Sequence, residues 1–175
     1  HYRQDSLKFR AACFLNANMR WHYSDDSGYC LYSDAKDSDL CDLRRFDRSF
    51  LISHVDHAFD VWDSSPCAAG LSFCEFCEYI LPYRSLAGYP DCFSGAELYD
   101  LFGKYVGAGQ GDSLAGYVAR YNRVKTDFEG VTGKRLALDS SLYRPFFPGR
   151  ECTDVAVIGC QILRACGLPG MVEFC

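Results

Sequence analysis

The strongest constraint on the fold lies near the end of the chain, where the segment from Thr153 to Cys166 has the length of a helix. After Thr153, its strongly polar side chains are Asp154, Gln161 and Arg164. A helix that is apolar on nearly all sides is stable only when other parts of the protein cover it. We therefore expect this helix to be the most buried in the chain, and Gly167 and Pro169 follow it in the order that ends helices. The side chains expected to contact the preceding helices are Val155, Ile158, Ile162 and Leu163.

Helical periodicity is also present in five earlier segments, in which apolar residues recur every three or four positions. These segments are 5–19, 48–62, 73–80, 95–106 and 112–128. Ser72 can cap the third of them, and Pro82 ends it. Residues 129–149 have the composition of a loop, and 171–174 predict a strand. The chain is therefore expected to be mainly α.

The composition is that of one globular domain, and it excludes several classes of protein. The 175 residues include 49% apolar and 23% charged side chains, which excludes a disordered chain. The net charge is −5 and no basic cluster is present, so we predict that nucleic acid is not a partner. The longest apolar run, 155–160, is far shorter than the roughly 18 residues that a membrane-spanning helix needs.

The chain contains 11 cysteines, an odd number that exceeds ordinary usage. Several fall at helical spacings among apolar residues, as small buried hydrophobic residues do. The chain also has more hydrophobic runs than a small disulfide scaffold usually has. We therefore do not predict a disulfide framework; one or two bridges stay open, with Cys30, Cys41 and Cys67 as candidate partners.

Cys152 lies where the buried helix is expected to begin, directly after Arg150 and Glu151. The free N–H groups and the positive dipole end of a helix N-terminus favour a thiolate, which is the nucleophilic form of cysteine. A catalytic nucleophile would suit this position. A structural cysteine at a helix start fits it as well, and from position alone the structural interpretation is favoured.

Two other groups of reactive side chains are candidates for a functional site, one for binding zinc and one for a catalytic dyad. His54, His57, Cys74 and Cys77 could in principle bind zinc, but zinc ligands usually lie on turns, and both cysteines lie in a helical pattern. We therefore predict no metal site and expect the histidines at the rim of their helix. A dyad of His57 and Cys152 is the other alternative, although the motif that accompanies such a pair is missing.

Three segments of the chain together resemble the transglutaminase-like superfamily. The segment 150–174 is similar to the nucleophile segment of that family: a cysteine opens a helix, an acidic residue and an alanine follow, and Leu-Arg-Ala-Cys-Gly-Leu-Pro precedes a strand. The segment 77–84, Cys-Glu-Tyr-Ile-Leu-Pro-Tyr-Arg, is similar to a helical segment of bacterial members, and 2–24 is similar to their start. The three segments occur in the family's order and bracket nearly the whole chain.

The resemblance implies a helical region over 1–149 and the start of a papain-type α+β core over 150–175, packed as one unit, with most of the sheet absent. It implies a thiol acyl-transfer enzyme, more specifically a hydrolase of peptide or amide bonds, with Cys152 as the nucleophile. The implied partner is a peptide or protein substrate, and no cofactor is implied. The resemblance also favours an exported bacterial protein of the periplasm or cell surface.

In that family the general base, a histidine, and its orienting aspartate follow the cysteine, whereas all 4 histidines of this chain precede Cys152. We therefore expect a fragment that is inactive by itself, with the base beyond Cys175, and that self-associates through the face left uncovered. The family usually has glycine where Arg150 or Glu151 stands here, and a glutamate beside the sulfur raises its pKa. The alternative is therefore a non-catalytic binding or scaffold module of the same fold.

Overall fold

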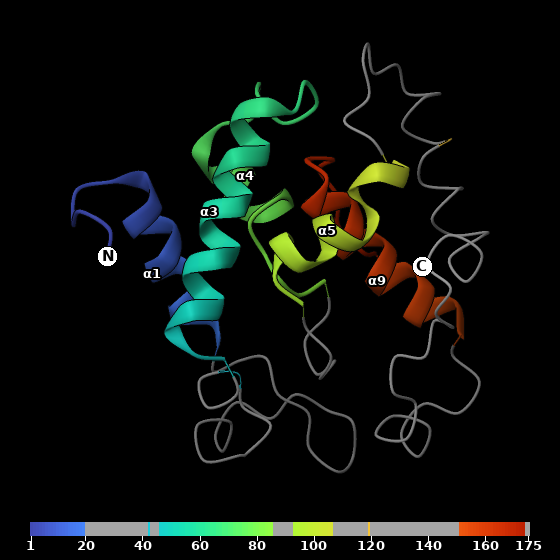
Figure 1. Cartoon of the computed structure of the whole chain (residues 1–175), viewed down its shortest axis with the longest axis horizontal. Helices are drawn as coiled ribbons and strands as arrows, with labels where there is room; N and C mark the ends of the chain where they lie inside the picture. Colours follow the sequence, from blue (N-terminus) through green and yellow to red (C-terminus); the bar gives the residue numbers. More distant parts are fainter. Residues whose placement is uncertain (20–41, 43–45, 86–92, 107–118, 120–150, 174–175) are drawn as a thin grey trace.

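The structure is a computed structural model that describes residues 1–19, 42, 46–85, 93–106, 119 and 151–173. Over these residues the chain is mainly helical, as predicted, and they form no β-strand. The helices are α1 (Leu7–Met19), α3 (Arg48–Ser64), α4 (Phe73–Tyr79), α5 (Gly95–Val106) and α9 (Glu151–Ala165). Figure 1 shows α3 between α1 on one side and the packed pair of α5 and α9 on the other.

Three of the helices begin at a polar side chain that caps the first turn. Asp47 accepts a hydrogen bond from a backbone N–H of the first turn of α3. At the start of α4, Ser72 and Glu75 form a capping box, in which each side chain accepts from the backbone N–H of the other residue. Ser94 and Glu97 make the same pair of bonds at α5. These bonds satisfy N–H groups that have no partner inside the helix, so they fix where each helix begins.

The C-terminus of α9 is closed by a Schellman motif at Gly167. The N–H of Leu168 donates to the carbonyl of Leu163 at 2.9 Å, and the N–H of Gly167 donates to the carbonyl of Arg164 at 3.0 Å. Gly167 has a φ of +74°, and a Cβ at this position would lie 2.5 Å from Cβ of Ser65. Glycine is therefore required both by the backbone and by the close approach of α9 to the end of α3.

The hydrophobic core has two parts, and α9 belongs to the second. The first lies among α1, α3, α4 and the residues after α4; its least exposed members are Ala11, Val55, Ala68, Phe76 and Leu81. The second joins α5 to α9 and includes Leu98, Phe102, Ile162, Leu163 and Leu168. Every residue from 159 to 168 is buried, so the predicted burial of this helix is confirmed, including Ile162 and Leu163. The side chains of Val155 and Ile158 lie outside the described residues.

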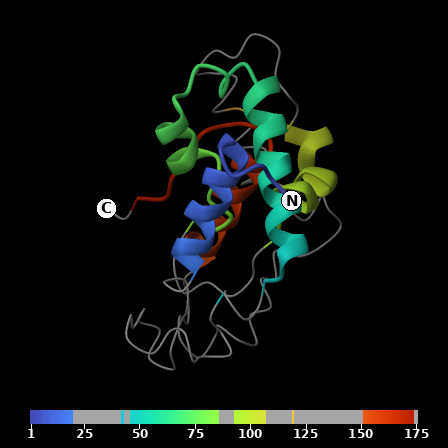
Figure 2. The same ribbon diagram turned by 90° about the vertical axis from the view of Figure 1, so that its left-hand side faces the viewer.

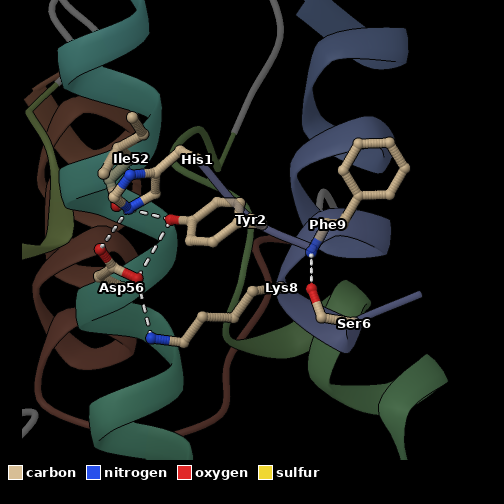
Figure 3. Close-up of polar contacts among 7 residues, drawn as sticks. All are labelled: His1, Tyr2, Ser6, Lys8, Phe9, Ile52 and Asp56. Carbon is tan, nitrogen blue, oxygen red and sulfur yellow. Dashed lines mark hydrogen bonds and ion pairs between the residues drawn. The ribbon is translucent and has the colours of Figure 1, made fainter. Parts of the chain in front are cut away.

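Polar contacts attach the N-terminal segment and α1 to α3 (Figure 3). The hydroxyl of Tyr2 donates to Oδ1 of Asp56 at 3.1 Å, and Nζ of Lys8 donates to the same oxygen at 2.8 Å. Burial, together with the Asp56 carboxylate, raises the pKa of the Tyr2 phenol. In the view of Figure 2, α1 lies in front, so the chain begins on the side of α3 opposite to α5.

Several sequence predictions differ from the structure or fall outside it. The strand predicted over 171–174 is not formed at residues 171–173, which have no regular secondary structure; residue 174 lies outside the described residues. The predicted helix 112–128 lies outside the described residues except for Ala119, which is helical. Cys30 and Cys41, two members of the group considered for bridges, also lie outside them. None of the described helices is long and apolar enough to cross a membrane.

Candidate functional site

The predicted nucleophile, Cys152, is the second residue of α9 and therefore lies in the first turn of that helix. Backbone N–H groups of a first helical turn have no partner within the helix, so the start of α9 can hold negative charge. Figure 1 shows this end of α9 (orange) directed away from α3, while its other end (red) lies among α3 and α5. The side chains of residues 151–155 lie outside the described residues, so the placement of Cys152 rests on the backbone.

The opposite end of α9 is held to α3 by two hydrogen bonds. Nε2 of His57 lies 2.7 Å from the carbonyl oxygen of Ala165, the last residue of the helix. The buried hydroxyl of Ser65 donates to the carbonyl oxygen of Gly167 at 2.6 Å. The last carbonyl groups of a helix have no partner within it. Here His57 of α3 and Ser65, the C-cap of α3, supply hydrogen bonds to carbonyl groups at this end of α9. These bonds fix the axis of α9, and with it the position of its first turn.

Arg164 fixes the same end of α9 to the segment that follows α4. Its guanidinium is buried, and Nε donates to the carbonyl of Gly170 at 2.8 Å while Nη1 donates to the carbonyl of Arg84 at 3.0 Å. Arg84 in turn makes two parallel bonds to the carboxylate of Asp42, at 2.7 and 2.6 Å. A buried charge needs such partners, because an unpaired one is costly to remove from water. Arg164, a charged residue in a mainly apolar helix, therefore has a structural role: it links the end of α9 to the segment after α4.

His54 is buried between α3, the end of α4 and the start of α5. Its Nδ1 accepts from the N–H of Gly95 at 2.8 Å, so its Nε2 carries the proton and donates to the carbonyl of Leu81 at 2.6 Å. Burial, with the charges of His57 and Arg164, lowers the pKa of His54 to about 4. The expectation that this histidine lies at a rim is wrong, because two backbone groups require it in the interior.

The structure does not bring His57 and Cys152 together. Nε2 of His57 contacts the last residue of α9, whereas Cys152 lies in its first turn, 13 residues earlier, or roughly 20 Å at 1.5 Å per residue. A general base must reach the proton it takes at about 3 Å. In this structure His57 therefore cannot serve Cys152 as a base.

The four side chains considered for zinc all lie in the described part of the chain and do not gather there. No group of three or more histidine, cysteine or acidic side chains in that part could hold a metal ion. Nε2 of each histidine is instead hydrogen-bonded to a backbone carbonyl oxygen, that of Leu81 for His54 and that of Ala165 for His57.

Cysteines within the described helices fall into exposed and buried thiols. Cys13 and Cys74 are exposed free thiols, while Cys77, Cys160 and Cys166 are buried ones. Burial raises the pKa of Cys166 to about 12 and, with smaller electrostatic contributions, raises that of Cys77 to about 11. Buried thiols of this kind react slowly, since the thiolate is the reactive form.

Sequence reasoning missed a small cavity among α3, α5 and α9. It has a volume of about 10 Å³ and is lined by residues that include His54, His57, Gln161 and Arg164. Among these lining residues, Gln161 has a buried Oε1 that finds no hydrogen-bond partner among the described residues. The one sequence signal was the presence of Gln161 in an apolar helix. A space of this size suits a single water and not an organic substrate.

Comparison of the chain with protein-family models, with curated proteins and with solved structures finds no match.

Proposed function

We propose that this chain carries the nucleophile of a thiol acyl-transfer enzyme, specifically a hydrolase of peptide or amide bonds, and that Cys152 is that nucleophile. The observation that supports it is the position of residue 152 in the first turn of α9. The opposite end of this helix is buried and bonded to α3 through His57 and Ser65. A nucleophile in the first turn of a helix that is fixed at its other end has a defined direction of attack.

The start of α9 supplies two of the properties that such an enzyme needs. The helix dipole and the free N–H groups stabilise a thiolate at residue 152, which lowers the pKa of the thiol relative to an ordinary cysteine. The backbone N–H of the same residue is available to donate to an oxyanion that forms on the substrate carbonyl. Preorganised donors of this kind usually make the largest single contribution to acyl transfer.

In the proposed reaction, Sγ of Cys152 attacks the carbonyl carbon of a peptide or amide bond. The tetrahedral intermediate expels the amine, which takes up a proton, and an acyl thioester of Cys152 remains. Water then attacks the thioester, releases the carboxylic acid and restores the thiol. No cofactor and no metal take part in these steps.

The base that assists Cys152 comes neither from His54 nor from His57. His54 is engaged with Leu81 and Gly95 in the interior, and His57 is engaged at the far end of α9. General-base assistance is typically worth 10²–10⁴-fold, so the chain by itself is expected to react slowly. The family resemblance assigns this role to a histidine encoded after Cys175.

Trapping of the acyl-enzyme tests the function directly. The chain, and a version that continues about 100 residues along the same reading frame, would be incubated with a generic ester and amide library. The expected result is hydrolysis by the longer version, with acyl groups recovered on the peptide that contains Cys152. Cys152→Ala should abolish both signals, while Cys13→Ala, at an exposed cysteine of α1, should leave them unchanged.

A non-catalytic module of the same fold is the second candidate, and it is favoured by the residue that precedes the sulfur. Glu151 directly precedes Cys152 in the sequence, and a carboxylate beside a thiol opposes formation of the thiolate. If both versions of the chain hydrolyse nothing, and if Glu151→Gln raises the reactivity of Cys152, the module is the better description. Activity in the short chain that disappears on changing His57 would instead contradict the placement of the base outside α3.

A further inference from the structure

Helix α4 carries two thiols one helical turn apart that have no part in the proposed acyl transfer. Cys74 is exposed, whereas Cys77 is only 6% exposed and belongs to the core shared by α1, α3 and α4. Both are free thiols. The exposed one is open to a soluble reagent, whereas the buried one is largely shielded from it.

The spacing of these cysteines is compatible with a disulfide bond. Residues three apart in an α-helix have Cα atoms about 5 Å apart, from a rise of 1.5 Å per residue and a radius of about 2.3 Å. Disulfide bonds join Cα atoms that are usually 4.4–6.8 Å apart, although their Cβ atoms must approach closer than the helical 5–6 Å. Because α4 is only 7 residues long, a local adjustment of its first turn disturbs few backbone hydrogen bonds.

The surroundings of the two sulfurs give them different roles. Burial, together with Cys74 and Glu78, raises the pKa of Cys77 to about 11, while Arg10 of α1 acts in the opposite direction. The guanidinium of Arg10 lies 4.7 Å from the ring of Phe73, which neighbours Cys74 in sequence, so a cation stands beside this turn. Because Cys74 is exposed while the buried Cys77 holds its proton more tightly, Cys74 is the thiol that reacts first, and Cys77 is the thiol that resolves the product.

We propose that Cys74 and Cys77 form an oxidisable dithiol that exchanges with low-molecular-weight disulfides such as oxidised glutathione. The thiolate of Cys74 attacks one sulfur of the reagent and expels a thiolate, which leaves a mixed disulfide on Cys74. Cys77 then loses its proton to solvent, attacks Sγ of Cys74 and expels the second thiolate. Two cysteine thiols are oxidised to one disulfide bond, and one molecule of oxidised glutathione is reduced to two of the thiol.

The experiment equilibrates the folded chain in glutathione redox buffers, blocks the remaining thiols and maps the products by mass spectrometry. The expected product is a bond between Cys74 and Cys77, recognised by fragment spectra that lack backbone cleavage between these residues until reduction. Ring closure should accelerate about tenfold per pH unit between pH 7 and pH 9, because the thiolate fraction of a thiol with a pKa of about 11 rises in that proportion.

Variants separate the two steps of the reaction. Cys77→Ala should stop at a mixed disulfide on Cys74, and Cys74→Ser should leave Cys77 reduced in the folded protein. Cys13→Ser is the matched control, because Cys13 is exposed on α1 and has no cysteine one turn away in that helix; it should change nothing. Circular dichroism confirms that each variant is folded.

Three results would overturn the inference. The first is a folded wild-type chain that stops at the glutathione adduct of Cys74 or does not react there. The second is a bond from either cysteine to Cys67 in place of the predicted one. The third is oxidation of Cys77 in Cys74→Ser at the wild-type rate. All of these measurements concern cysteines of α4, so their outcome is independent of the role proposed for Cys152.

Discussion

The backbone N–H of Gly95 donates to Nδ1 of His54 at 2.8 Å, and this bond decides which nitrogen of the imidazole carries the proton. The approach is close: a Cβ on Gly95 would lie 2.8 Å from Cδ2 of His57 and 3.4 Å from Nδ1 of His54. The first residue of α5 therefore has to be a glycine for α3 and α5 to pack in this way. Protonation of Nδ1 would remove the acceptor that holds them together.

Stability should accordingly fall as His54 is protonated. Its pKa is lowered from 6.5 to about 4 by burial, so between these values the unfolded chain binds more protons than the folded one. Stability is then fully present above pH 6.5 and decreases as the pH falls toward 4, by about 3 kcal/mol in all for this shift. Urea unfolding at a series of pH values measures it. His54→Gln, which cannot titrate, should lose this part of the pH dependence, and an unchanged slope in the variant would show that His54 is not buried in the neutral form.

Asp42→Asn should be strongly destabilising. The carboxylate is fully buried and accepts two bonds from Arg84 and one from the hydroxyl of Tyr83. Removing one partner of a buried ion pair typically costs about 3–5 kcal/mol, because the other charge stays buried. The matched control is Asp5→Asn, whose ion pair with Arg3 is exposed and should contribute less than about 1 kcal/mol. Similar free energies of unfolding for the two variants would contradict the buried placement of Asp42.

Gly167→Ala should destabilise the connection between α9 and α3. The φ of +74° costs a residue with a Cβ about 1–2 kcal/mol, and the contact with Ser65 adds to this. Gly70→Ala provides the comparison, since a Cβ on Gly70 meets nothing within 4 Å. Thermal unfolding of both variants should show a lower midpoint for Gly167→Ala alone. An equal midpoint would mean that the helix does not end in the left-handed turn described.

Ile162→Ala tests the burial of α9 itself. The side chain of Ile162 has an exposed fraction of 0%, so its truncation should cost about 2–5 kcal/mol in the free energy of unfolding. Met171 is 56% exposed just beyond the same helix, and Met171→Ala should change the stability by less than about 0.5 kcal/mol. If Ile162→Ala is as mild as the control, the helix lies in water and the fold is wrong.

The helices could be predicted from the sequence because their signals are local. The recurrence of apolar residues every three or four positions predicts α3 and α5 to within two residues of their observed bounds. Ser72 marks the start of α4. The apolar character of α9 predicted its burial. The strand after it could not be judged locally, because a strand forms only against a partner that lies elsewhere in the chain.

Contacts that fix the candidate site were not predictable in the same way. Ser65 and Gly167 are 102 residues apart in sequence, and His57 and Ala165 are 108 apart. No spacing rule joins such residues, so the sequence alone predicts that the histidines of α3 lie at a rim. Cys152 was placed correctly at a helix start because that inference needs only the local pattern, while its chemical role stays a prediction.

The most direct test of Cys152 as the nucleophile is mass-mapped labelling of the folded chain with limiting iodoacetamide between pH 5 and pH 9. Labelling of Cys152 should outpace that of the exposed Cys13 at the acidic end, with an apparent pKa below the ordinary 8.5. Cys166, whose pKa burial raises to about 12, should stay unlabelled. If Cys160 or Cys166 is labelled as fast as Cys152, or if Cys152 follows the pH profile of Cys13, the assignment of the nucleophile is contradicted.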